Sequence, residues 1–160
     1  MDLDLDAARQ LLAAQSLSVL LGAEVVEFSP DRTVLVVPIR DEHLQQNGLA
    51  HGGLVWCSCV RRSPGSRALQ QNGLAHGGLV AYAADNAITF AAGAAVGPDV
   101  LTAETNANHV AGARGSRLEA RATVVNVSRR LVTVRCDAFD GDESRLCAVA
   151  QGTVARVGSD

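Results

Sequence analysis

A helix that is apolar on almost every side is the feature that most limits how this chain of 160 residues can fold. The pattern from Leu79 to Ala92 predicts this helix, in which Asp85, Asn86 and Thr89 are the only clearly polar residues. A helix of that composition is buried on most of its surface. Other parts of the chain must therefore be wrapped around it.

The segments after this helix alternate apolar and polar residues with a period of two, which predicts strands. The strands are expected at 99–110, 117–127, 131–139 and 145–157. Their short connections indicate an antiparallel meander. Before the helix, the β-rich segments 23–28 and 33–39 flank a turn signal and predict a hairpin. An α+β architecture follows, with a curved antiparallel sheet of about six strands around the long central helix.

A further amphipathic helix is predicted at the N-terminus. Apolar residues recur at helical spacing from Asp4 to Leu21, and Gly22 stands where a C-cap is expected. The first residues are acidic where a signal peptide would be basic, and no apolar run is expected to reach the length of a transmembrane helix. We therefore expect a cytoplasmic protein with a single domain over residues 1–160.

Charge and composition narrow the range of partners. A net charge of −3 and a pI near 5.8 give no electrostatic footprint for nucleic acid or for an anionic membrane. Aromatic residues make up only 3%, so the core must consist mainly of Ala, Val and Leu, and burial by self-association would add to it. The lone Cys57-x-Cys59 pair has no His-rich neighbourhood, so neither a metal site nor a disulfide framework is expected.

Twelve residues, LQQNGLAHGGLV, occur twice, at 44–55 and at 69–80. Two units are fewer than a stacked repeat needs, so we interpret a local duplication. In the second copy His76 is followed nine residues later by Asp85, whereas the matching position of the first copy is Val60. We predict that the insertion around 44–68 is a loop excursion and that the second copy builds the functional site. In the competing arrangement the first copy forms the native turn, which would disrupt the start of the helix.

The Gly77-Gly78 pair marks the N-terminus of the central helix. Free backbone N–H groups point out of such an end, and glycine lets a ligand approach them closely. They could hold an oxygen that becomes negative during acyl transfer. The alternative is that the two glycines only allow the helix to pack tightly.

Asp85 is a carboxylate in the middle of an apolar helix, where it costs stability unless something uses it. The alternative is that Asp85 and Asn86 form a polar stripe that faces solvent. His76 and Asp85 are nine residues apart, which is roughly 13 Å along a helix. If both ends serve one substrate, a second subunit must supply one of them, so the spacing indicates a dimer.

Residues 76–87, HGGLVAYAADNA, resemble the signature of the hotdog-fold acyl-CoA thioesterases of the phenylacetate-pathway (PaaI) type. The segments 102–108, 115–120, 128–130 and 148–153 sit where that family has its closing strands. The resemblance covers most of the chain apart from the insertion. It implies a hotdog fold, in which an antiparallel sheet wraps a central helix, with dimers that join their sheets edge to edge and assemble into tetramers.

The resemblance also implies roles for individual residues. Asp85 would be the nucleophile or the general base that acts on an acyl-CoA thioester. The Gly77 N–H would polarise the thioester carbonyl, and His76 would orient that turn or touch the substrate, unless it only caps the helix. Gln70 stands where the family often has an Asn that contacts water or the carbonyl, and Asn72 is the alternative donor.

Further residues are expected to contact the substrate. Gly78 and Thr102 would line the site. The arginines are expected to cluster and to bind the phosphates of coenzyme A, although each could be an ordinary solvated side chain; they are Arg114, Arg117, Arg129 and Arg130. Coenzyme A is part of the substrate, and no separate cofactor is expected. Residues 108–111 depart from the aromatic-then-Pro ending common in the family, which leaves the acyl group open, and His43 and His109 receive no role.

Two other functions compete with hydrolysis. The chain could be a hotdog protein that binds acyl-CoA without turnover because the insertion has inactivated it. A hotdog hydratase is the weaker alternative, since the paired Asp and His spacing of that family is absent.

Overall fold

The computed structural model describes residues 3–40, 75–142 and 144–157. The predictions for the first copy of the duplicated stretch, for the excursion around 44–68, for Gln70 and for Asn72 concern residues outside this part of the chain. The second copy is described from Ala75 onward.

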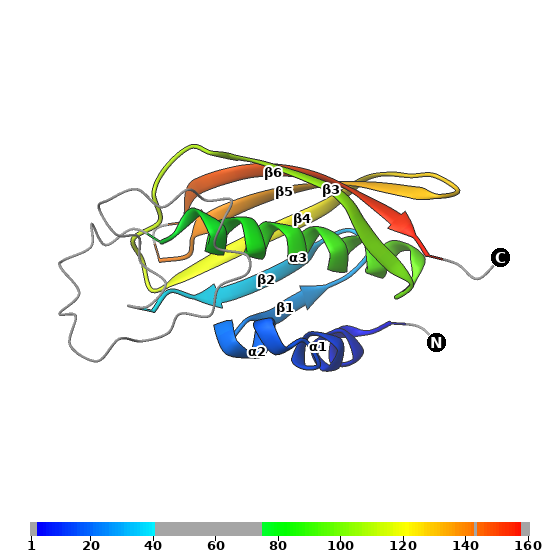
Figure 1. Ribbon diagram of the computed structural model, residues 1–160, viewed down its shortest axis with the longest axis horizontal. Helices are drawn as coiled ribbons and strands as arrows, with labels where there is room; N and C mark the ends of the chain where they lie inside the picture. Colours follow the sequence, from blue (N-terminus) through cyan, green and yellow to red (C-terminus); the bar gives the residue numbers. More distant parts are fainter. Residues whose placement is uncertain (1–2, 41–74, 143, 158–160) are drawn as a thin grey trace.

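The described residues form three helices and six strands in the predicted order (Figure 1). They are α1 (Leu5–Ala13), α2 (Ser16–Leu21), β1 (Glu24–Phe28), β2 (Thr33–Pro38), α3 (Gly77–Val96), β3 (Val100–His109), β4 (Arg117–Val127), β5 (Leu131–Asp140) and β6 (Arg145–Arg156). The hairpin, the long central helix and the four later strands are thereby confirmed, each within a few residues of its predicted bounds.

All six strands belong to one antiparallel sheet with the order β1-β2-β4-β5-β6-β3. The predicted meander holds for β4, β5 and β6 but is wrong for β3. That strand pairs with β6, with Thr105 opposite Gly152, and lies at the far edge of the sheet from its successor β4. The segment 110–116 carries the chain from β3 at the edge to β4 in the interior of the sheet.

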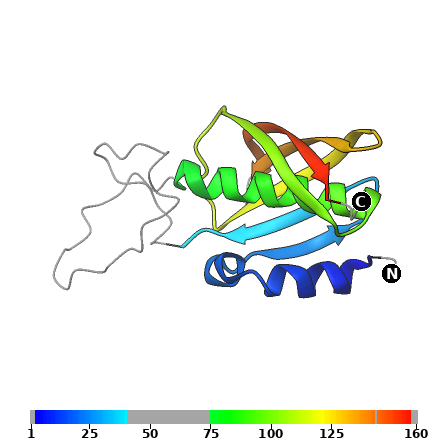
Figure 2. The ribbon, with the colours of Figure 1, turned by 45° about the vertical axis from the view of Figure 1, so that its right-hand side comes forward.

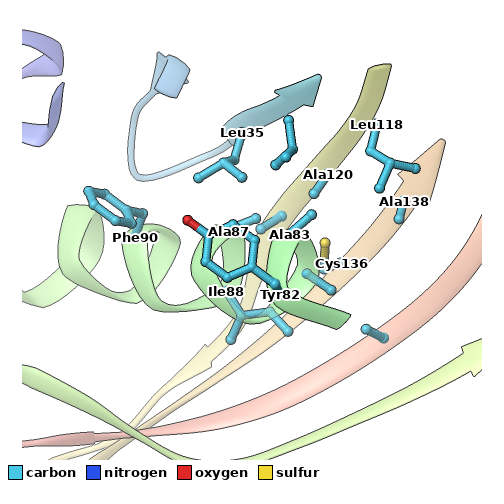
Figure 3. Packing of buried hydrophobic residues seen from close by; sticks show 14 of the residues in the cluster. Leu35, Tyr82, Ala83, Ala87, Ile88, Phe90, Leu118, Ala120, Cys136 and Ala138 are labelled. Atoms are coloured by element: carbon cyan, nitrogen blue, oxygen red, sulfur yellow. The ribbon is translucent and has the colours of Figure 1, made fainter. Parts of the chain in front are cut away.

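The sheet curves around α3, which contacts every strand (Figures 1 and 2). Small side chains fill the contact: buried alanines on β4 and β5 face Ala83 and Ala87 on the helix (Figure 3). On β6, Gly152 leaves space for Ile88, because a Cβ there would lie 2.8 Å from the Ile88 Cγ2 atom. A core of alanine, valine and leucine thus lets the helix approach the sheet closely, as the low aromatic content predicted.

By length and composition alone, α3 could cross a membrane, contrary to the expectation that no apolar run is long enough. Within this helix of 20 residues, an 18-residue window has a mean hydropathy of 1.4, and 61% of that window is buried inside the fold. Because the sheet surrounds it, the apolar character of α3 is explained by its place in the core.

The predicted N-terminal helix is broken into two. Helix α1 ends at Ala13, with Ala14 as its C-cap. Gln15 then has an extended backbone before α2 begins at Ser16. The second helix ends as predicted at Gly22, whose φ of 67° is a left-handed C-cap. The break turns Ser18 toward α3, where it accepts a 2.7 Å hydrogen bond from the buried Tyr82 hydroxyl. This tertiary contact accounts for a break that local helix propensity does not predict.

Candidate active site

Helix α3 and strand β3 lie side by side along the edge of the sheet and place polar side chains between them. We call this line of residues the α3–β3 seam. It consists of Gly77, Asp85 and Thr89 from α3 and of Thr102, Thr105 and His109 from β3. The two elements run in opposite directions, so the start of α3 meets the end of β3. The seam therefore collects the predicted functional residues of the helix at the open edge of the sheet.

Asp85 lies in the middle of the seam and is half-buried. Its Oδ1 atom accepts a 2.8 Å hydrogen bond from the Thr105 hydroxyl. Among the described residues, no donor reaches the other carboxylate oxygen, Oδ2. The carboxylate is thus fixed in orientation by one oxygen and keeps the second oxygen for another group. Sequence reasoning missed Thr105, because a register shift between Thr102 and Glu104 interrupts the alternation of β3 and so places both Thr102 and Thr105 toward α3.

One turn beyond Asp85, Thr89 and the predicted site residue Thr102 meet across the seam. Their hydroxyl oxygens lie 2.6 Å apart, and either can be the donor. The Thr89 hydroxyl also bonds the backbone oxygen of Asp85 at 2.9 Å. These contacts tie β3 to the helical turn that carries the carboxylate.

The N-terminus of α3 distinguishes its two glycines. The His76 side chain is the N-cap, and its Nδ1 atom accepts a 2.9 Å hydrogen bond from the Gly78 N–H. The Gly77 N–H has no acceptor among the described residues. Of the two glycines, Gly77 is therefore the one whose N–H lacks an acceptor in the described part of the chain, whereas the Gly78 N–H is used by the His76 cap.

Packing does not explain the glycine at position 77. Within the described part of the chain, a Cβ at Gly77 would meet only the His109 ring, with Nε2 at 3.5 Å, an ordinary contact distance. At Gly78 a Cβ would lie 3.0 Å from His76 Nδ1, so that glycine accommodates the cap. Among the described residues, only the His109 ring borders the position of a Gly77 side chain, and no close contact there requires a glycine.

A loop between β3 and β4 holds the turn that precedes α3. The Ala75 N–H donates a 2.8 Å hydrogen bond to the Ala113 carbonyl. Next to it, the fully buried Asp140 accepts hydrogen bonds from the backbone N–H groups of Arg114, at 2.8 Å, and Gly115, at 3.1 Å. The start of the helix is therefore anchored through this loop to the end of β5.

The neighbouring Asp142 holds the same loop from the outside. The backbone N–H and the hydroxyl of Ser116 both donate to its carboxylate, and these bonds hold the pKa of Asp142 below its ordinary value. Arg117 adds a distant ion pair to the same carboxylate at 4.0 Å. Two acidic side chains thus fix the segment that supports Ala75.

The structure does not bring the four predicted arginines together. Arg114 and Arg117 lie just before and at the start of β4, whereas Arg129 and Arg130 follow its end. A strand of this length separates them by roughly 35 Å. The sequence spacing concealed this separation, because the intervening residues form one continuous strand. Of these four, Arg114 and Arg117 lie at the end of the molecule where α3 begins, next to the loop that anchors Ala75.

The described residues contain no group of three or more His, Cys, Asp or Glu side chains that could hold a metal ion. The thiols of Cys136 and Cys147 are buried in strands. Burial and the adjacent Asp137 carboxylate raise the pKa of Cys136 to about 12, so this thiol is inert at neutral pH.

Comparison with known proteins identifies the family. The sequence model of the thioesterase superfamily matches residues 72–147, which include α3 and the whole of the α3–β3 seam. A Deinococcus radiodurans protein named as a presumed esterase is 30% identical over 144 residues, covering 89% of this chain and 80% of the relative. The chain belongs to the thioesterase superfamily. Its α+β architecture is accordingly the hotdog fold of that superfamily.

Solved structures of thioesterases show the same fold. A thioesterase of Haemophilus influenzae is 22% identical and superposes with a TM-score of 0.72 over 97% of this chain and 91% of its own. A thioesterase family protein of Silicibacter pomeroyi is 26% identical, with a TM-score of 0.70 and coverage of 92% and 93%. The phenylacetic acid degradation protein PaaI of Thermus thermophilus, in a mutant form, is 25% identical, with a TM-score of 0.66 and coverage of 89% and 100%. All three structures share the sheet and the central helix that position the seam.

Proposed function

We propose that this thioesterase hydrolyses acyl-CoA thioesters to a free carboxylic acid and coenzyme A. The observation that carries the proposal is a pair of groups along one seam: a carboxylate fixed through one oxygen, and the N-terminus of a helix. Among the described residues, neither the second carboxylate oxygen nor the first N–H of the helix has a partner. Membership of the thioesterase superfamily supports the reaction class. The resemblance to PaaI-type enzymes supports coenzyme A as the thiol half of the substrate.

In the proposed reaction, Asp85 acts on the thioester carbonyl carbon through its free oxygen Oδ2. As a general base it takes a proton from water while the water oxygen bonds to that carbon; as a nucleophile it bonds to the carbon itself. In either route the carbon–sulfur bond then breaks and coenzyme A leaves as a thiolate. In the nucleophile route water next attacks the resulting mixed anhydride, which releases the carboxylic acid and restores the Asp85 carboxylate. In both routes the proton that water has lost goes to the thiolate. The Gly77 N–H donates to the carbonyl oxygen as its negative charge develops.

The two groups must come from different chains. Gly77 and Asp85 are eight residues apart on α3, which is about 12 Å along the helix axis. One carbonyl group does not reach both within one chain. We propose that a second copy docks at the β3 edge, so that Gly77 of one chain and Asp85 of the other address one substrate, and that such dimers form tetramers. The free outer side of β3 and the 64% exposure of Leu101 on that strand support this edge as the interface.

Several smaller assignments accompany this proposal. His76 orients the turn, Gly78 and Thr102 line the substrate site, and no cofactor other than the coenzyme A of the substrate takes part. Arg114 and Arg117 bind phosphates of coenzyme A near the start of α3, and Arg129 and Arg130 do so only if the partner chain brings them to that end. The protein is cytoplasmic, where acyl-CoA is made and used.

A panel of aryl and alkyl acyl-CoA thioesters, with release of free thiol as the readout, tests the activity. We expect turnover of at least one member, and we expect Asp85→Asn to lower kcat by at least about 100-fold while the protein still folds, because the amide keeps the shape and loses the base. A matched control is Asn86→Ala on the adjacent helix position, which is expected to stay within about threefold of the unmodified protein. Full activity of Asp85→Asn would refute the mechanism, and binding of acyl-CoA without turnover by the unmodified protein would identify a binding protein instead.

The backbone donor can be removed without a change of side-chain function. Gly77 is the first residue of α3, a position that tolerates proline, and His76 before it is already extended. We therefore expect Gly77→Pro to fold and to lose most activity. Mixing it with Asp85→Asn should restore up to about a quarter of the activity, since one intact site forms in a mixed dimer. No restoration after subunit exchange would show that one chain supplies both groups.

Rapid-quench mass spectrometry separates the two roles of Asp85. If Asp85 is a nucleophile, a covalent acyl adduct on Asp85 forms during the first turnover. If Asp85 is a general base, product forms without this adduct.

A further inference from the structure

His109 stands at the end of β3 next to the N-terminus of α3, and neither the sequence patterns nor the proposed mechanism gives it a task. Its Nε2 and Cε1 atoms lie 3.5 Å and 3.6 Å from the position that a Cβ would take at Gly77. Within the described residues, its side chain makes no hydrogen bond or ion pair, and the residue is exposed. Among the described residues, an imidazole edge therefore lies beside the Gly77 N–H, and neither group has a protein partner.

The direction of the helix relates these two groups. Cα–Cβ bonds in a helix tilt toward its N-terminus, and the N–H groups of the first turn point the same way. The Cβ position at Gly77 and the Gly77 N–H therefore border the same space at the start of α3. Because the nearest atom of the His109 ring to that position is Nε2, this nitrogen borders the space as well.

We propose that His109 is a further catalytic residue, whose Nε2–H donates a second hydrogen bond to the thioester oxygen that the Gly77 N–H holds. This inference rests on the proposed function and extends it. Both the neutral tautomer with its proton on Nε2 and the imidazolium present this donor. No proton is transferred, so the bonds made and broken in hydrolysis remain those given above.

The other histidine of the site does not fill this role. Nδ1 of His76 already accepts from the Gly78 N–H, and that contact fixes the ring as the helix cap. The proposal therefore divides the reaction between the chains of a dimer. One chain supplies both donors to the oxygen, Gly77 and His109, and the other supplies the Asp85 carboxylate.

Two substitutions of His109 test the donor. His109→Phe keeps a flat ring and removes the N–H, whereas His109→Gln offers an amide N–H at similar reach. We expect His109→Phe to lower kcat by about 10-fold to 100-fold with KM within about twofold, because the lost bond is strongest in the transition state. His109→Gln should recover a large part of that loss. Asn108→Ala is the matched control, since neighbouring side chains of a strand point to opposite faces; it should match the unmodified protein.

Several results would overturn the inference. They are a kcat for His109→Phe equal to that of the unmodified protein, a rise in KM with kcat unchanged, and no recovery in His109→Gln. A panel in which the unmodified protein hydrolyses no thioester, or in which Asp85→Asn is fully active, would instead refute the proposed function.

A spectroscopic measurement tests the donor without turnover. In an acyl-CoA analogue with a ¹³C-labelled ketone in place of the thioester, hydrogen bonds to the carbonyl oxygen move its ¹³C resonance downfield. We expect the resonance of the bound analogue to lie further upfield in His109→Phe and in Gly77→Pro than in Asn108→Ala. An unchanged resonance in His109→Phe would overturn the inference, whatever the activity of the protein.

Discussion

The two edge strands of the sheet, β1 and β3, differ in how far other parts of the chain cover them. Helix α1 packs against β1, and the Arg9 Nε–H donates a 3.0 Å hydrogen bond to the Val25 carbonyl on that strand. A register shift interrupts the ladder in both edge strands, between Val25 and Glu27 in β1 and between Thr102 and Glu104 in β3. Strand β3 has neither cover nor capping side chain among the described residues, and its apolar Leu101 is exposed.

The difference supports β3, rather than β1, as the edge at which the proposed second copy docks. Natural proteins protect edge strands against pairing with other chains, and the β1 edge carries such protection. The polar side chains that face α3 from a strand edge belong to the unprotected edge, β3. The candidate site residues of the α3–β3 seam and the open edge therefore lie on the same side of the molecule.

The largest effect is expected from charges placed on the open edge. In the double variant Leu101→Lys/Val110→Lys, two exposed apolar residues at and after β3 become cations, which a second copy would have to bury without partners. We expect monomers by light scattering and a loss of thioester hydrolysis of about 100-fold or more. The matched variant Val19→Lys/Val26→Lys alters exposed residues near β1 and should keep both mass and activity. An active dimer in the first variant would remove the distinction between the edges.

The next largest effect is expected from the substitution of one glycine near each edge of the sheet, Gly77 near β3 and Gly22 near β1. Gly77→Ala adds a methyl group beside the free donor, at an ordinary contact distance, so kcat should fall about tenfold while the melting temperature stays the same. Gly22→Ala, near β1, forces a side chain into a φ of 67° and should lower the free energy of unfolding by about 1–2 kcal/mol with kcat per folded molecule unchanged. Thermal unfolding and the thiol assay together measure both. If Gly77→Ala lost stability but kept its activity, Gly77 would have a packing role and not a catalytic one.

Removing one hydroxyl on each side of α3 should have a smaller effect. Thr105→Val deletes the hydrogen bond to Asp85, worth about 1 kcal/mol, and should lower kcat about fivefold. Tyr82→Phe deletes the buried bond to Ser18 and should cost about 1 kcal/mol of unfolding free energy without a change in kcat. Urea denaturation and initial rates check the pair. Equal losses of activity in both variants would show that the Thr105–Asp85 contact in the seam contributes no more to catalysis than the Tyr82–Ser18 contact does.

The smallest effect is expected at the covered edge. Arg9→Met keeps the aliphatic part of the side chain and removes the bond to the Val25 carbonyl. We expect a loss of about 1 kcal/mol in unfolding free energy, measured by urea denaturation, with activity and mass unchanged. A larger assembly in this variant would show that β1 also joins copies once its cap is gone.

The elements of the fold could be predicted because their signals are local. The apolar character of α3 and the alternation of β4, β5 and β6 each follow from a few consecutive residues. The place of β3 beside β6 depends on pairing between distant residues, such as Thr105 and Gly152, for which a single sequence has no local signal. The break before α2 likewise follows from the contact between Ser18 and Tyr82.

The residues of the candidate site also differ in whether the sequence alone could predict them. Asp85 is conspicuous as a charge within an apolar helix, and Gly77 as part of a glycine pair at its start. Thr105 and His109 carry no such signal, because a threonine and a histidine are ordinary on an exposed strand, and only the position of β3 beside α3 gives them a role. The roles of Gln70 and Asn72 stay predictions, since both lie outside the described residues.

The bond between Ala75 and Ala113 has a consequence for how the gene of such a protein can change. Helix α3 begins two residues after an anchor that is supplied by the later half of the chain, through the loop held by Asp140. The register of the helix is therefore set from downstream and does not depend on the number of residues before Ala75. An insertion upstream of this anchor, such as the one predicted around 44–68, leaves this contact and the spacing of His76, Gly77 and Asp85 unchanged.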